Sequence, residues 1–146
     1  MADGVKIHFR LEQDADGYPP VAVESVWAQP AAEAGEYVVD NVPFFTREAT
    51  IGDTVRARKE DGNLWFKSVV ARSENSLVRI VFFERGAVGA ISRQLESLGC
   101  SVEYIATHNL LAVSIPGNVL LADIQAYLQH EAKADKIDYE EAILRQ

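Results

Sequence analysis

The run Leu77-Val78-Arg79-Ile80-Val81-Phe82-Phe83 is apolar except for a single arginine. A short run rich in β-branched and aromatic residues predicts a buried strand. Apolar residues then recur at helical spacing between Ala87 and Leu98, and Gly99 follows at the position where helices commonly end in a left-handed residue. We therefore expect a strand followed directly by an amphipathic helix.

The remaining second half continues to alternate strand and helix patterns. Ser101–Ile105 and Leu110–Ile115 are strand candidates on either side of a turn, and Asn118 is the expected N-cap of a second amphipathic helix. Ile137–Ile143 completes the series as a last strand. The order β-α-β-β-α-β predicts a ferredoxin-like unit, an antiparallel sheet with two helices on one face.

The first half has strand patterns only. Val5–Leu11 alternates apolar and polar residues, and Val21–Trp27 is a second candidate. Thr54–Arg58 and Leu64–Ala71 flank an Asp-Gly pair at 61–62, which accommodates the positive φ angles of a hairpin turn. Short strands separated by turn residues indicate a small curled sheet or barrel.

The predicted fold class is therefore α+β. We expect a β-rich half-barrel at residues 1–75 and a ferredoxin-like subdomain at residues 76–146. No linker rich in proline, glycine and serine separates the two halves, so the sequence predicts that they pack together as one unit.

Composition narrows the classes of partner. The 146 residues are 48% hydrophobic and 25% charged, as in globular proteins, and the formal net charge is −8. Such a charge repels phosphate backbones and acidic membrane surfaces, so neither nucleic acid nor a membrane is the expected partner, whereas a basic protein is. The sequence gives no indication of oligomeric state.

The sequence also indicates the cellular compartment. The chain contains no apolar stretch of about 18 residues, and its first residues lack the pattern of a secretory signal. The lone Cys100 cannot form an internal disulfide, which is typical of a reducing compartment. We expect the protein in the cytoplasm.

Motifs for metal, cofactor or nucleophilic chemistry are missing from the sequence. His8, His108 and His130 are far apart and do not form a metal-ligand pattern, so no metal site is predicted. The glycines do not form a phosphate-binding loop, so no cofactor is predicted. Cys100 follows a helix C-terminus, which does not activate a thiol, and it is interpreted as a buried residue at the start of a strand.

The carboxylates in the predicted loops leave open the alternative that the protein is an enzyme, although no catalytic motif supports it. Asp14, Asp16, Asp40 and Asp53 all lie in predicted loops. Paired carboxylates can act as acid and base, but loop aspartates more commonly bond their own backbone as turn formers. An enzyme built on Asp40, Asp53 and His108 is therefore the third hypothesis.

Cations and aromatics also meet in the predicted hairpin at residues 54–71. Arg56, Arg58 and Lys59 lie opposite Trp65 and Phe66. Interleaved basic and aromatic side chains can bind single-stranded nucleic acid. Packing of arginine stems on aromatic rings accounts for the same pattern, and the acidity of the chain favours that interpretation.

The most distinctive local pattern is Asp40-Asn41-Val42-Pro43-Phe44-Phe45. Neighbouring residues of an extended segment point to opposite sides, so Phe44 and Phe45 cannot both point inward. One of them is expected to be an exposed anchor for a partner. The alternative is that the loop folds over an open barrel end and plugs it.

Several motifs carry a resemblance to a known family. They are Tyr18-Pro19-Pro20, the Asp40–Phe45 pattern, Gly52-Asp53, Leu64-Trp65-Phe66 and Gly99-Cys100. On these residues the chain resembles a bacterial family of small proteins described only as a domain of unknown function, the family numbered 4265. The resemblance covers most of the chain and implies that the two halves are continuous. It implies no activity, cofactor or catalytic residue.

The leading hypothesis is a non-catalytic immunity protein or antitoxin that binds and neutralises a basic toxin or effector domain. Small size, acidity and the lack of catalytic motifs favour it. The expected partner-binding residues are acidic and aromatic loop residues: Asp14, Asp16, Tyr18, Asp40, Asn41, Phe44 and Phe45. The alternative is a small-molecule regulatory module that uses the ferredoxin-like half, with a ligand at the turn formed by Glu84-Arg85-Gly86.

Overall fold

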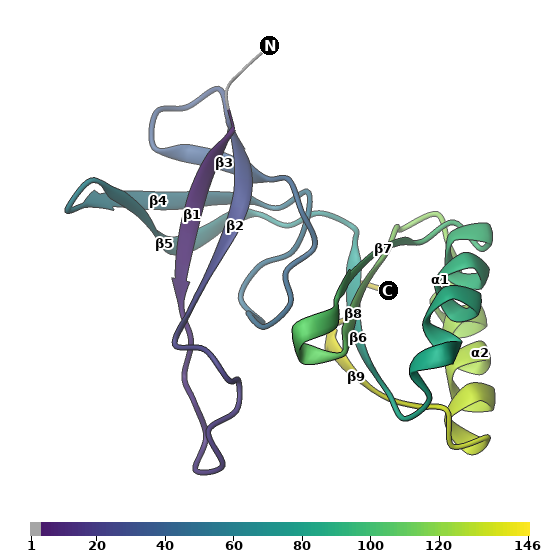
Figure 1. Cartoon of the computed structure of the whole chain (residues 1–146). Coiled ribbons are helices and arrows are strands. Elements are labelled where there is room, and N and C mark those ends of the chain that lie inside the picture. The colour runs from purple at the N-terminus through teal and green to yellow at the C-terminus, as the bar shows by residue number, and fades with distance from the viewer. Residues whose placement is uncertain (1–3) are drawn as a thin grey trace. The chain divides into compact units, whose positions relative to one another are not determined.

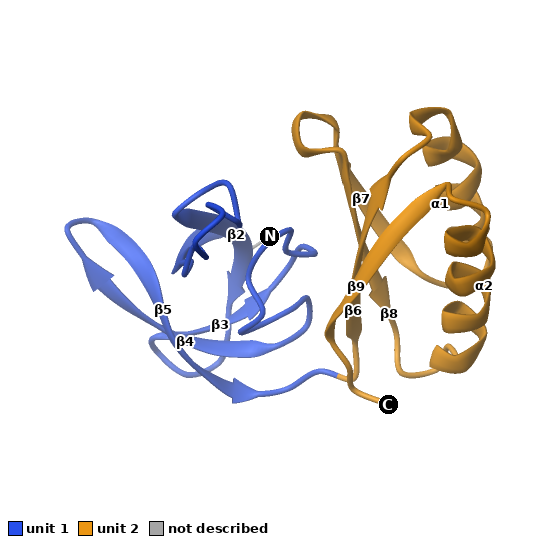
Figure 2. Cartoon of the chain, turned by 90° about the horizontal axis from the view of Figure 1, so that it is seen from below, with its two compact units in different colours: residues 1–73 blue, residues 74–146 orange. Residues whose placement is uncertain are grey.

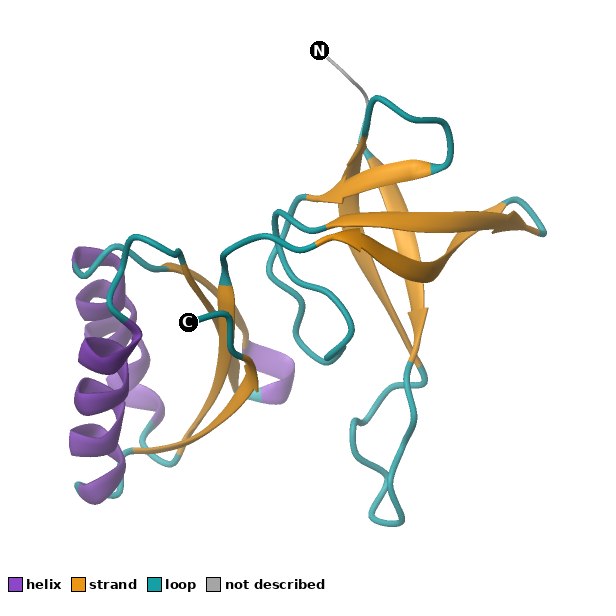
Figure 3. Cartoon of the chain, turned by 180° about the vertical axis from the view of Figure 1, so that it is seen from behind, coloured by secondary structure: helices purple, strands orange, loops and turns teal. Residues whose placement is uncertain are grey.

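The protein consists of two compact units. The structure, a computed structural model, describes residues 4–146, and the units comprise residues 1–73 and 74–146 (Figure 2). Among the described residues, the regular elements of the first unit are strands only, and α1 and α2 both belong to the second unit (Figure 3). The chain is therefore an α+β protein, as the sequence predicts.

The first unit is a closed five-stranded barrel (Figure 1). Its strands follow one another around the barrel in chain order: β1 (Val5–Arg10), β2 (Val23–Pro30), β3 (Glu36–Val39), β4 (Thr54–Glu60) and β5 (Asn63–Ala71). Consecutive strands pair antiparallel, and β1 closes the barrel by pairing parallel with β5. Closure leaves this unit without an unpaired sheet edge.

Alternation along the strands fills the barrel with apolar side chains. In β1, Ile7 and Phe9 are buried, and Lys6, His8 and Arg10 occupy the outward positions. The ring of Phe9 stacks on that of Phe66 with centroids 4.6 Å apart, so Phe66 lies inside rather than beside Trp65 on the surface. Phe66 is partly buried against this core, and an aromatic pair of this kind stabilises a small core beyond its area alone.

The hairpin of β4 and β5 forms where the sequence predicts it. Asp61 and Gly62 both have positive φ angles, 53° and 81°, as a two-residue hairpin turn requires. The second strand differs from its prediction, because β2 starts at Val23 and continues to Pro30.

The second unit is a four-stranded antiparallel sheet covered by two helices. Its elements are β6 (Ser76–Phe82), α1 (Val88–Ser97), β7 (Ser101–Ile105), β8 (Leu110–Ile115), α2 (Leu121–Lys133) and β9 (Ile137–Ile143). The spatial order of the strands is β7-β8-β6-β9, so each helix connects strands that are not neighbours. Figure 3 shows α1 and α2 on the same face of this sheet.

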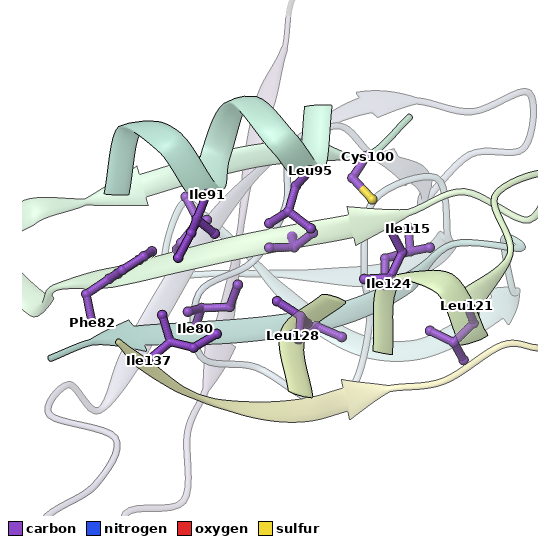
Figure 4. Packing of buried hydrophobic residues seen from close by; sticks show 13 residues of the cluster. Ile80, Phe82, Ile91, Leu95, Cys100, Ile115, Leu121, Ile124, Leu128 and Ile137 are labelled. Carbon is purple, nitrogen blue, oxygen red and sulfur yellow. The ribbon is translucent and has the colours of Figure 1, made fainter. Parts of the chain in front are cut away.

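The core of the second unit lies between the sheet and the helices (Figure 4). Ile91 and Leu95 of α1 and Ile124 and Leu128 of α2 are completely or almost completely buried there. In these helices the buried residues recur at intervals of three or four, the periodicity that the sequence shows. Each fully buried aliphatic side chain contributes about 1.5–3 kcal/mol relative to an exposed one.

The ends of the two helices were predicted with different success. Gly99 has a φ of +102° directly after α1, which confirms its role as the terminating glycine. Asn118 is not the N-cap of α2, because the helix starts later and Leu120 occupies that position without a side-chain cap. Instead, the Gln146 side chain accepts the N–H of Leu121 at 3.1 Å.

None of the helices in residues 4–146 is long and apolar enough to cross a membrane.

Candidate partner-binding site

The β1–β2 loop, residues 11–22, extends beyond the barrel strands as a long excursion (Figure 1). Its tip is folded around Asp14, whose Oδ1 accepts the N–H groups of Asp16 and Tyr18 at 2.9 and 3.0 Å. The N–H of Asp14 in turn donates to the carbonyl of Tyr18 at 2.7 Å. Asp14 is therefore a turn former. Asp16 is exposed, and Tyr18 is 48% exposed.

A second loop, residues 40–53, is clamped to the barrel by Glu24. The Glu24 side chain occupies an inward position of β2 and is only 8% exposed. Its two carboxylate oxygens accept three successive backbone N–H groups, from Phe44 at 2.6 Å, Phe45 at 3.0 Å and Thr46 at 2.8 Å. Such charge-assisted hydrogen bonds from the backbone hold the loop in place even though it contains no helix or strand.

The two loops meet through an aromatic contact. The rings of Tyr18 and Phe45 are arranged edge to face, with centroids 6.4 Å apart. Two stretches separated in sequence by the strands β2 and β3 therefore share one surface. Because Asp14 and Asp16 belong to the same tip as Tyr18, this surface combines acidic and aromatic side chains. We call Asp14, Asp16, Tyr18 and Phe45 the acidic–aromatic tip.

Asp40 and Asn41 attach the second loop to β2. The N–H of Asp40 donates to the carbonyl of Trp27 at 2.8 Å, and Asn41 Oδ1 accepts the N–H of Trp27 at 2.6 Å. The Asp40 side chain is exposed and its Oδ2 accepts Gln29 Nε2 at 3.2 Å. These contacts make Asn41 an anchor of the loop, and they leave the Asp40 carboxylate at the surface.

Neither phenylalanine of the second loop is the fully exposed anchor that the sequence suggested. Phe44 and Phe45 are both half-buried. The barrel core instead receives Ala49 from this loop, and Ala49 is completely buried. Thr46 and Val42 are also buried. The loop therefore folds onto the barrel, and it does so through small residues.

Asp53 ends the same loop and has a structural position. It is completely buried. Its Oδ2 accepts the N–H of Thr50 at 3.1 Å, and its Oδ1 accepts the N–H of Ser73 at 2.8 Å. These bonds hold the loop end and the end of the first unit together, as expected of a turn-forming aspartate.

Cys100 in the second unit is buried, as predicted, at the start of β7. Desolvation raises the pKa of its thiol from 9.0 to about 11. At neutral pH the side chain is therefore a protonated thiol, which is a weak nucleophile. Among the described residues 4–146, His, Cys, Asp and Glu side chains form no group of three or more that could hold a metal ion.

Glu24 is the residue of this site that the sequence argument missed. An acidic residue at an inward position of the strand Val23–Pro30 is the signal that could have found it, because a carboxylate there requires partners. The partners come from positions 20 to 22 residues later in the chain, and no local pattern reveals them.

Comparisons with known proteins identify a family and a fold. The chain is similar to a solved structure described as "Novel crystal structure of a hypothetical protein from Neisseria gonorrhoeae", with a TM-score of 0.71 and 20% identity. The match covers 99% of this chain and 96% of the other, and at this identity it shows the fold alone. No curated protein matches the chain significantly. A family model matches residues 24–139, so the chain belongs to the family described as Domain of unknown function (DUF4265).

Proposed function

We propose that this protein is a non-catalytic immunity protein or antitoxin of the cytoplasm, which binds a basic toxin or effector domain and neutralises it. The observation that carries the proposal is the Tyr18–Phe45 contact, with ring centroids 6.4 Å apart. It joins the acidic tip of one loop to the clamped aromatic segment of another. The barrel beneath them is a rigid closed support, and loops held in this way are well suited to recognition.

The chemistry of the tip favours a basic protein partner. Tyr18 offers a half-exposed aromatic side chain, and tyrosine is among the residues that contribute most to protein interfaces. Asp16 adds an exposed carboxylate next to it, in a chain with a net charge of −8. Charges of this sign accelerate association with a basic domain and disfavour acidic partners. Covering the partner's active site would then require no catalytic residue from this chain.

The experiment is capture of the partner from the native cell with the tagged protein, followed by mass spectrometry. A single stoichiometric basic partner is expected. With that partner in hand, Asp16→Lys and Tyr18→Ala should each weaken binding by about tenfold or more, since interface anchors commonly contribute more than 1 kcal/mol. Glu96→Lys is the matched control, because Glu96 is an exposed residue of α1 in the second unit.

Retention of the partner by Asp16→Lys and Tyr18→Ala at wild-type affinity would contradict the proposed surface. Failure to capture any partner would contradict the proposed function.

We also infer that the second unit has the ferredoxin-like arrangement. Support comes from the chain order β-α-β-β-α-β, the strand order β7-β8-β6-β9 and the antiparallel pairing of all neighbours. Domains of this kind also serve as small-ligand regulatory modules. If no partner is captured, the next experiment is a thermal-shift screen with amino acids and nucleotides, in which a bound ligand raises the melting temperature.

A further inference from the structure

A second exposed surface lies on the outer wall of the barrel. It is formed by Lys6, His8 and Arg10 of β1, Trp27 of β2 and Trp65 of β5. We call these five residues the cation–aromatic face. Strand register brings them together, because Lys6 lies opposite Trp27 and His8 lies opposite Trp65. Their positions alternate with the inward-facing residues of the same strands.

The cations of this face lie over its aromatic rings. The guanidinium carbon of Arg10 is 3.9 Å from the centroid of the Trp65 ring, and Lys6 Nζ is 4.9 Å from that of Trp27. The His8 and Trp65 rings are inclined, with centroids 5.3 Å apart. The face is therefore an ordered array of stacked groups, and Trp27 remains 50% exposed within it.

Charge on this part of the barrel is segregated from that of the rest of the chain. The chain has 22 acidic and 14 basic residues, yet β1, β2 and β5 contain a single carboxylate, that of Glu24. Glu24 is buried and engaged with the second loop. Electrostatic interactions are screened within about 8 Å at physiological salt, so a ligand on the face senses mainly the nearby charges. These are the charges of Lys6 and Arg10 and that of the exposed carboxylate of Asp40, whose N–H donates to the Trp27 carbonyl.

We propose that the cation–aromatic face binds single-stranded nucleic acid. Lys6, His8 and Arg10 occupy alternate positions of one strand and are therefore spaced by roughly 6–7 Å. This spacing is comparable to the separation of successive phosphates in an extended single strand. Trp27, which is 50% exposed, supplies a flat aromatic surface on which a base can stack, and Trp65 holds the Arg10 guanidinium over its ring. Stacking next to cations is how proteins hold single strands without reading sequence.

The aromatic groups distinguish this ligand from other anions. An acidic peptide would need only the cations, whereas the face displays both tryptophans of the chain. In duplex nucleic acid the bases are stacked within the helix and do not reach the indole rings. The sequence-based expectation against nucleic acid rests on the net charge of the whole chain, and the structure locates the opposite charge on one face.

The test is titration of the full-length protein with a short fluorescein-labelled oligothymidylate, followed by anisotropy and by tryptophan fluorescence. Because Trp27 and Trp65 are the only two tryptophans, quenching reports on this face alone. Binding should weaken with salt. Two phosphates neutralised by Lys6 and Arg10 predict a slope of about −1.4 in log K against log salt concentration.

Two variants and a control test whether the oligonucleotide binds at this face. Trp27→Thr removes an exposed stacking surface and should lower affinity about tenfold. Lys6→Gln combined with Arg10→Gln should lower affinity and reduce the salt slope by about 1.4. Arg93→Gln removes an exposed cation from α1 and should change neither quantity. Circular dichroism of each variant checks that it is folded.

Three results would overturn the proposal: no anisotropy change up to about 100 μM protein at low salt, oligonucleotide binding without tryptophan quenching, or unchanged affinity in both variants. A fourth result would also overturn it: if polyglutamate binds the face as tightly as the oligonucleotide, the ligand is an acidic polypeptide and not a nucleic acid. The acidic–aromatic tip involves different residues, so the outcome is independent of the capture experiment.

Discussion

Replacing Glu24 with glutamine should destabilise the barrel by about 3–5 kcal/mol. The amide keeps the shape of the side chain and one oxygen, which can still accept the N–H groups of Phe45 and Thr46, now as neutral bonds about 1 kcal/mol weaker each. The new NH₂ group faces the N–H of Phe44, which donates to a Glu24 carboxylate oxygen at 2.6 Å in the parent protein. An unsatisfied donor of this kind costs about 1–3 kcal/mol.

Urea unfolding monitored by tryptophan fluorescence reports on the stability of the first unit, since Trp27 and Trp65 both belong to residues 1–73. With a denaturant slope of about 1 kcal/mol/M for a unit of this size, the midpoint should fall by about 3–5 M. Glu33→Gln, an exposed residue, is the matched control and should leave the midpoint unchanged. A Glu24→Gln midpoint within about 0.5 M of the parent would refute the argument that the carboxylate holds the loop.

Further predictions concern the second unit. Alkylation of Cys100 at pH 8 should be about 100-fold slower in the native protein than in urea, because burial raises its pKa from 9.0 to about 11; comparable rates would contradict burial of the thiol. The same shift makes the Cys100 contribution to stability complete below pH 9 and lost as the pH rises towards 11, which urea midpoints at pH 8 and 10 can test. Gly99→Ala should cost at least about 1–2 kcal/mol, because φ is +102° and the added Cβ would lie 2.8 Å from Val119 Cγ2. Gly89→Ala in the first turn of α1 should instead stabilise by up to about 0.5–1 kcal/mol, because the exposed Arg93 side chain, 3.2 Å from the added Cβ, can move aside; circular dichroism melts compare the two variants. Gln146→Ala removes the acceptor for the N–H of Leu121 and should cost about 0.5–2 kcal/mol, a value that the same melts can refute.

Much of the candidate site depended on contacts that sequence patterns do not encode. The acidic and aromatic composition of the loops was visible in Asp14, Asp16 and Tyr18. Their role in partner binding stays a prediction. What no local pattern revealed is that Tyr18 meets Phe45, because that contact requires the whole of β2 and β3 to be placed first. The same holds for the clamp on Phe44–Thr46 by Glu24.

The α+β class, the hairpin at Asp61-Gly62, the burial of Cys100 and the end of α1 at Gly99 could be predicted from the amino-acid sequence, because these follow from residue periodicity and from local backbone preferences. Closure of the strands into a barrel, and the bond from Gln146 to the start of α2, could be known only from the three-dimensional structure. The same is true of the stacking of the β1 cations on Trp27 and Trp65. The physical reason is that closure, capping by a distant residue and cross-strand stacking depend on register between segments far apart in the chain, which the spacing of residues within one segment does not fix.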